Sequence, residues 1–173
     1  MKKVICLILC VVLCAGAVCG CLEVKTITGN EWLVKLQISY DNAVVFCEGM
    51  DEVYELYLLG SITGQDFLNE HAILDTQYNI LRNEYIRLKN ETTIEAGSHS
   101  YVSIRGSEAI EELYSLLGEL LDNTIVNNLP VAPEKMMYIY MAYEQKIKKC
   151  FSDYAAALLI YNETIDASSE AEG

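Results

Sequence analysis

Residues 27–57 decide the fold, and they read ITGNEWLVKLQISYDNAVVFCEGMDEVYELY. Apolar residues in this stretch recur at alternating spacings of three and four, which places them on one face of an α-helix. These positions are Leu33, Leu36, Tyr40, Ala43, Cys47, Met50, Tyr54 and Tyr57. The residues between them are mostly polar or charged, as a solvent-facing side requires. The stretch therefore predicts an amphipathic helix over residues 30–59.

The start of this helix carries its own signal. The Thr28 side chain is placed to accept a hydrogen bond from the backbone N–H of Glu31, and the Glu31 carboxylate can return one to the backbone of Thr28. Thr63 and Asp66 repeat this arrangement before the next apolar stripe. Both helix starts are therefore predicted to be capping boxes.

Three further stripes complete the pattern. Together with the first, they predict helices at about 30–59, 64–91, 107–128 and 133–163. Short connections between the first and second helices and between the third and fourth favour antiparallel neighbours. We therefore expect an all-α fold, an antiparallel up-down-up-down four-helix bundle over residues 30–163. Residues 92–106 are expected to form a long loop and 164–173 a disordered acidic tail, and no β-hairpin is predicted.

The first residues of the chain look like an export signal. Two lysines precede an unbroken apolar run at residues 4–14, and small residues follow it. The sequence Val18-Cys19-Gly20-Cys21 then resembles the lipobox of prokaryotic membrane lipoproteins. The resemblance implies that residues 1–20 are a cleaved signal peptide, that Cys21 carries the lipid, and that residues 21–29 form a short tether.

Two other outcomes remain open for this segment. Ala15-Gly16-Ala17 also suits an ordinary signal peptidase, which would release a secreted, soluble helical protein. A segment left uncleaved would act as a short membrane anchor.

Composition excludes several classes of function. The net charge of −13 argues against nucleic acid and against an anionic membrane surface as partners. The chain has no glycine-rich phosphate loop, and neither of its two histidines follows a glutamate by three positions, as a di-iron bundle would require. His99 and Ser98 are too close in sequence to form a catalytic pair. We therefore expect no catalytic residues, no metal and no cofactor.

Two cysteines of the mature region fall on core stripes. Cys47 lies on the first helix and Cys150 on the last, at similar heights if these helices are antiparallel neighbours. Because an exported protein sits where disulfides persist, we expect a disulfide between them. The alternative is a pair of buried free thiols.

Tyrosine is frequent, with 12 residues, and most of them fall on the stripes. A buried tyrosine needs a partner for its hydroxyl group. The hydroxyls must therefore bond across the bundle, reach its rim, or surround a ligand. The predicted lining of a ligand cavity is Tyr40, Tyr78, Tyr85, Tyr140 and Tyr154.

Residues 136–143 are apolar around the whole circumference of the last helix. One face is enough for the core, so the surplus face must be covered or must bind something. Either the loop at 92–106 covers it, or Met137, Tyr138 and Met141 form an interaction face for a partner.

These features predict a membrane-anchored extracytoplasmic lipoprotein, a non-enzymatic helical bundle that acts as an interaction or scaffold module. It would lie on the outer face of the cytoplasmic membrane or in the cell envelope. Its partners would be the lipid bilayer, through an acylated Cys21, and an envelope protein. The alternatives are a ligand-binding module with a tyrosine-lined cavity, and a secreted soluble protein.

Overall fold

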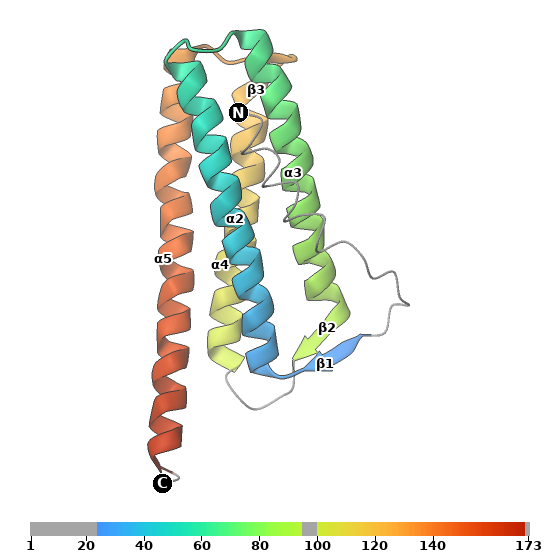
Figure 1. Cartoon of the computed structure of the whole chain (residues 1–173), viewed down its shortest axis with the longest axis vertical. Helices are drawn as coiled ribbons and strands as arrows, with labels where there is room; N and C mark the ends of the chain where they lie inside the picture. The colour runs from blue at the N-terminus through green and yellow to red at the C-terminus, as the bar shows by residue number, and fades with distance from the viewer. Residues whose placement is uncertain (1–23, 95–99, 172–173) are drawn as a thin grey trace.

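The computed structural model of the chain describes residues 24–94 and 100–171, and these are mostly helical (Figure 1). The all-α prediction is therefore confirmed, with two small strand pairs added. In chain order the elements are β1 (Lys25–Ile27), α2 (Gly29–Leu58), α3 (Gly64–Glu91), β2 (Thr92–Ile94), α4 (Ser100–Thr124), β3 (Ile125–Val126), β4 (Leu129–Pro130) and α5 (Pro133–Ala171).

The helices lie side by side along the long axis of the molecule (Figure 1). The turn between α2 and α3 and the β3–β4 hairpin occupy one end, which we call the hairpin end. The β1–β2 pair lies at the other end, the base. Helix α2 packs against the three other helices and α4 packs extensively on α5, whereas α3 and α5 lie on opposite sides.

Both helix starts predicted from the sequence are capping boxes. The Thr28 hydroxyl accepts a bond from the Glu31 N–H at 3.2 Å, and the Glu31 carboxylate accepts one from the Thr28 N–H at 3.1 Å. Thr63 and Asp66 form the same reciprocal pair at 3.2 and 3.0 Å. Each box satisfies two backbone donors that the first turn of a helix leaves without partners.

The end of α2 is equally well defined. Gly60 adopts a φ of 67°, a left-handed conformation that costs glycine little. The N–H of Gly60 then reaches the Tyr57 carbonyl, and the N–H of Ser61 reaches the Leu56 carbonyl. This is a Schellman motif, and it turns the chain sharply into α3.

The predicted stripes meet in one core. Its completely buried large side chains come from all four helices and from β1, and they are Ile27, Leu36, Met50, Tyr54, Phe67, Ile110, Leu113, Leu117, Leu120, Leu121, Met136 and Tyr154. The three-and-four spacing is thus a correct guide to burial on every helix.

Helix α4 differs from its prediction, because it begins at Ser100 and not at 107. The loop expected at 92–106 is wrong for residues 92–94, which form β2, and for residues 100–106, while 95–99 lie outside the described residues. Gly106, the last residue of the predicted loop, is buried in the helix against Leu36 and Tyr154. Tertiary packing of this kind outweighs the weak helix propensity of one glycine.

The absence of a β-hairpin was also a wrong expectation. Ile125 pairs with Pro130 and Val126 with Leu129 in an antiparallel hairpin. Its two turn residues, Asn127 and Asn128, have φ angles of 53° and 61°. A two-residue turn with both φ angles positive is type I′, and consecutive asparagines suit it.

The remaining differences lie near the ends of the chain. Part of the expected tether is strand β1, which pairs in parallel with β2 through Lys25–Thr92 and Ile27–Ile94. The predicted disordered tail is helical as far as Ala171, because no glycine or proline interrupts residues 134–171. The predicted signal peptide and Cys21 lie outside the described residues.

Candidate functional site

The tyrosine hydroxyls tie the helices together. Most of them donate to groups of a neighbouring element: Tyr57 to the Val131 carbonyl at 3.1 Å, Tyr78 to the Tyr114 carbonyl at 2.8 Å, Tyr85 to the Ser107 carbonyl at 3.0 Å, Tyr114 to the Ser39 carbonyl at 3.3 Å, Tyr140 to the Asp51 carboxylate at 2.5 Å and Tyr154 to the Gln37 side chain at 3.2 Å. In the described part of the chain no buried side-chain polar atom is left without a partner. The hydroxyls therefore bond across the bundle.

The five tyrosines predicted to line one cavity lie in three places. Tyr40 stacks on Tyr154, with ring centroids 4.6 Å apart. Tyr78 and Tyr85 line an open groove of about 700 Å³ between α3 and α4. Tyr140 lines a different groove, between α2 and α5. The structure thus brings these residues together in pairs at most, and not around a common space.

Tyr78 depends on a glycine that sequence reasoning missed. A Cβ atom at Gly118 would lie 2.3 Å from the Tyr78 hydroxyl oxygen, a distance that real atoms do not tolerate. The hydrogen atom of Gly118 therefore leaves the space through which the hydroxyl reaches the Tyr114 carbonyl. The sequence did contain a usable signal, because a glycine in the interior of a predicted helix usually allows another group to pack closely against it.

Cys47 and Cys150 are both buried and both free thiols in this structure, so the disulfide stays a prediction. Cys47 lines the groove between α2 and α5, and burial, aided by the nearby carboxylates of Asp51 and Glu48, raises its pKa to about 12. Burial and the charge of Glu112 on α4 raise the pKa of Cys150 to about 11. Both therefore remain protonated at neutral pH and are weak nucleophiles.

A buried polar network at the hairpin end was not expected from the sequence. The Thr124 hydroxyl lies 3.2 Å from the Tyr54 hydroxyl and 3.3 Å from Nε2 of His71. The same nitrogen lies 3.0 Å from the Leu121 carbonyl oxygen. Burial lowers the pKa of His71, although the bond to Leu121 acts in the opposite direction. The network joins α2, α3 and α4, whereas His99 lies outside the described residues.

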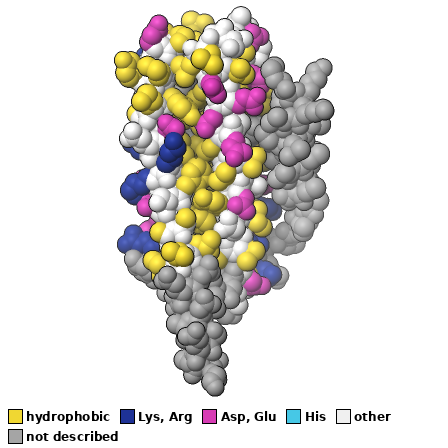
Figure 2. Space-filling view, turned by 60° about the vertical axis from the view of Figure 1, so that its left-hand side comes forward, with side chains coloured by type: hydrophobic (Ala, Val, Ile, Leu, Met, Phe, Trp, Pro, Cys, Tyr) yellow, Lys and Arg dark blue, Asp and Glu magenta, His cyan; other side chains and the backbone are white. Residues whose placement is uncertain are grey.

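The predicted interaction face is exposed. Met137, Tyr138 and Met141 on α5 have exposed fractions of 42%, 70% and 51%. The loop expected to cover them does not do so in the described region, because residues 100–106 begin α4 at the base. Three more exposed apolar residues, Leu59, Val126 and Leu129, belong to the turn and hairpin of the same end. Figure 2 shows hydrophobic side chains gathered there. We call these six residues the end face.

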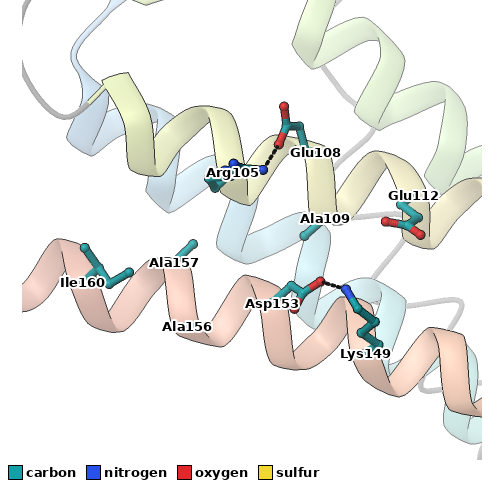
Figure 3. Close-up of a pocket in the computed structure, with 9 residues that line it drawn as sticks. All are labelled: Arg105, Glu108, Ala109, Glu112, Lys149, Asp153, Ala156, Ala157 and Ile160. Carbon is teal, nitrogen blue, oxygen red and sulfur yellow. Dashed lines mark hydrogen bonds and ion pairs between the residues drawn. The ribbon is translucent and has the colours of Figure 1, made fainter.

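A groove of about 390 Å³ lies between α4 and α5 (Figure 3). Arg105 pairs with Glu108 at 3.1 Å on one wall, and Lys149 pairs with Asp153 at 2.5 Å on the other. Each ion pair joins residues of a single helix and is exposed, so its contribution to stability is small. Of the five charged side chains drawn in Figure 3, four are paired in this way, and Glu112 is drawn without a paired group.

Neither the comparisons nor the described residues point to a known activity. No family model, curated protein or solved structure matches this chain. Within residues 24–94 and 100–171, no group of three or more histidine, cysteine or acidic residues could hold a metal ion. In the same residues, no helix is long and apolar enough to cross a bilayer.

Proposed function

We propose that the chain is a lipid-anchored extracytoplasmic module, an up-down-up-down bundle whose end face binds a partner protein without catalysing a reaction. The observation that carries this proposal is the end face itself. Exposed apolar residues are ordinary when they are scattered, but a cluster on one end marks an interaction site. The buried tyrosine hydroxyls already have protein partners, which favours a protein-binding role over a tyrosine-lined ligand cavity.

The position of the end face supports this function. Cys21 precedes β1 by only a few residues, and β1 lies at the base. Helix α2 has 30 residues, which corresponds to a length of about 45 Å at 1.5 Å per residue. A lipid on Cys21 would hold the base near the membrane and present the end face to the periplasm or exterior. The negative charge would keep the body away from anionic lipids.

Lipid attachment is tested by replacing Cys21 with serine. The wild-type chain should incorporate a labelled fatty acid and fractionate with membranes, and Cys21→Ser should do neither. Cys19→Ala is the matched control, because it removes a neighbouring thiol of the same segment and keeps the acceptor thiol of Cys21. Equal labelling of Cys21→Ser would contradict the anchoring.

The end face is tested with a photo-crosslinking residue at position 138. The expected result is one discrete adduct with an envelope protein in intact cells, lost when Met137 and Met141 are both changed to aspartate. Position 159 is the control, since Leu159 is also exposed on α5 but lies far from the hairpin end. Adducts at both positions, or at neither, would overturn the proposed function.

A further inference from the structure

An apolar groove runs between α2 and α5. Val44, Cys47 and Met50 line it from α2, and Ile147 and Phe151 line it from α5, around a hollow of about 190 Å³. Figure 2 shows a strip of hydrophobic side chains running along the molecule between two more polar ridges. Aromatic pairs at the groove, to which its lining residues Tyr140 and Phe151 belong, separate the two helices.

Two of these aromatic pairs cross from α2 to α5. Tyr40 meets Phe151 edge to face at 5.3 Å, and Tyr54 meets Tyr140 in the same way at 5.5 Å. Rings of this size prevent the two helices from closing on each other. The groove is therefore a fixed feature of the packing.

The α2 rim of the groove is acidic. Asp41, Glu48, Glu52 and Glu55 are all exposed, and their spacing places them on the side of α2 that faces outward and toward α5. Among the described residues, none of these four carboxylates forms an ion pair, and Lys35 is the only basic residue of α2. The rim thus carries negative charge that no ion pair within the described chain offsets.

The α5 rim is balanced. Glu144 and Lys148 line the groove and pair with each other at 2.6 Å. Met137 and Met141 come before Glu144 and Lys148 in the helix. Successive members of this set are three or four residues apart, so all four side chains lie on one side of α5. The groove therefore continues into the end face.

We propose that the α2–α5 groove binds an amphipathic helix of the partner protein, with apolar side chains in the groove and lysine or arginine side chains over the α2 rim. This inference rests on the proposed function and names the chemistry of its partner. A helix laid in an apolar groove is a common mode of peptide recognition. Asp41 and Glu55 are separated by about 21 Å along α2, so the bound helix needs about four turns.

Charge decides between the possible occupants. A second copy of this chain would bring two acidic rims together, and the net charge of −13 makes that encounter repulsive. An anionic lipid surface is repelled for the same reason. A basic helix gains both from burial of its apolar face and from the unneutralised carboxylates.

The test titrates the full processed chain with an 18-residue fluorescent peptide of leucine and lysine whose leucines lie on one helical face. The peptide should bind with an affinity that falls as salt rises, and its leucine–glutamate counterpart should not bind. Val44→Asp should weaken binding about tenfold or more, whereas Val45→Asp, an equal change of charge on the neighbouring exposed residue, should not. Val44→Thr, which keeps the side-chain shape, should also weaken binding if Val44→Asp unfolds.

Charge reversal supplies the second arm. Glu48→Lys with Glu52→Lys should weaken binding about tenfold or more, and Glu84→Lys with Glu91→Lys on α3 should change it by less than about threefold. Equal losses in both Glu→Lys pairs would reduce the binding to general charge attraction, and equal losses in Val44→Asp and Val45→Asp would show that the groove is not the binding site; either outcome would overturn the inference. Concentration-dependent dimerisation that Val44→Asp abolishes would overturn it in favour of a second copy. If the inference fails while the adduct at position 138 persists, the proposed function stands.

Discussion

Helix α4 meets its neighbours α5 and α3 in opposite ways. Toward α5 it packs over a long contact, and its small residue Ala109 is buried, with Ala157 of α5, where the two line the groove between the helices. Toward α3 it meets large ones, because Tyr78 and Tyr85 send their hydroxyls to its backbone carbonyls. The first seam relies on close contact of helix surfaces, and the second on a few specific hydrogen bonds.

The two glycines of α4 show the same contrast. A methyl group at Gly106 would meet Leu36 and Tyr154 at 3.5–3.7 Å, which is ordinary van der Waals contact. A methyl group at Gly118 would meet the Tyr78 hydroxyl at 2.3 Å. A methyl group is therefore accommodated at Gly106, whereas at Gly118 it forces Tyr78 to move.

The largest expected effect comes from Gly118→Ala. The added methyl must displace Tyr78, which overpacks the α3–α4 seam and breaks a buried hydrogen bond, at a combined cost of about 3 kcal/mol. Urea denaturation followed by circular dichroism measures the loss in the free energy of unfolding. A loss below about 1 kcal/mol would show that α3 can shift away at little cost, and that the seam is not specific.

Tyr78→Phe isolates the hydrogen bond of that seam. It removes the donor to the Tyr114 carbonyl and should lower the free energy of unfolding by about 1 kcal/mol, without the steric conflict. The same denaturation experiment measures it. Tyr138→Phe is the control, because the exposed Tyr138 should show no change.

Gly106→Ala should act in the opposite direction. The site has room for a methyl group, so the higher helix propensity of alanine should raise the free energy of unfolding by about 0.5–1 kcal/mol. A loss of stability would mean that α4 approaches Leu36 and Tyr154 more closely than the structure indicates. The contrast between the two glycines would then fail.

The smallest expected effect is a pH dependence of the free energy of unfolding, which arises where α3 contacts α4. His71 on α3 approaches the Leu121 carbonyl of α4, and burial lowers its folded-state pKa. Below the ordinary histidine pKa of about 6.5, the unfolded chain binds a proton that the folded chain resists. The free energy of unfolding should therefore fall as pH drops from 7 to 5.5. His71→Gln should flatten this slope, and an unchanged slope would assign it to other groups.

Much of the fold was predictable, because the sequence signals of a helix lie within the helix itself. The spacing of Leu36, Met50 and Tyr54 gave the buried face of α2, and Thr28 with Glu31 gave its start within one residue. The early start of α4 was not predictable in this way, since it depends on Gly106 being covered by residues from two distant helices. The β1–β2 pair joins positions almost seventy residues apart, and no local sequence pattern predicts this pairing. The hairpin was missed although Asn127 and Asn128 carried a usable signal.

The candidate site was predictable only in part. The exposure of Met137, Tyr138 and Met141 could be anticipated, because an all-apolar turn exceeds what one core face needs. Four of the five tyrosines, Tyr78, Tyr85, Tyr140 and Tyr154, have hydrogen-bond partners, which are carbonyl and side-chain groups on other helices and depend on how the helices pack. The acidic rim of α2 was visible in the sequence as a set of carboxylates. Its position beside an apolar groove required the structure.

The parallel pairing of β1 with β2 has a mechanical consequence. Residues 25–27 are the first part of the described chain, and they are bonded to a strand that follows α3 directly. A force that pulls β1 from its amino end would load all the hydrogen bonds between β1 and β2 at the same time, in shear. The force would then pass into both α2 and α3. A tether attached ahead of Val24 would therefore strain the whole base before it could unwind the first turn of α2.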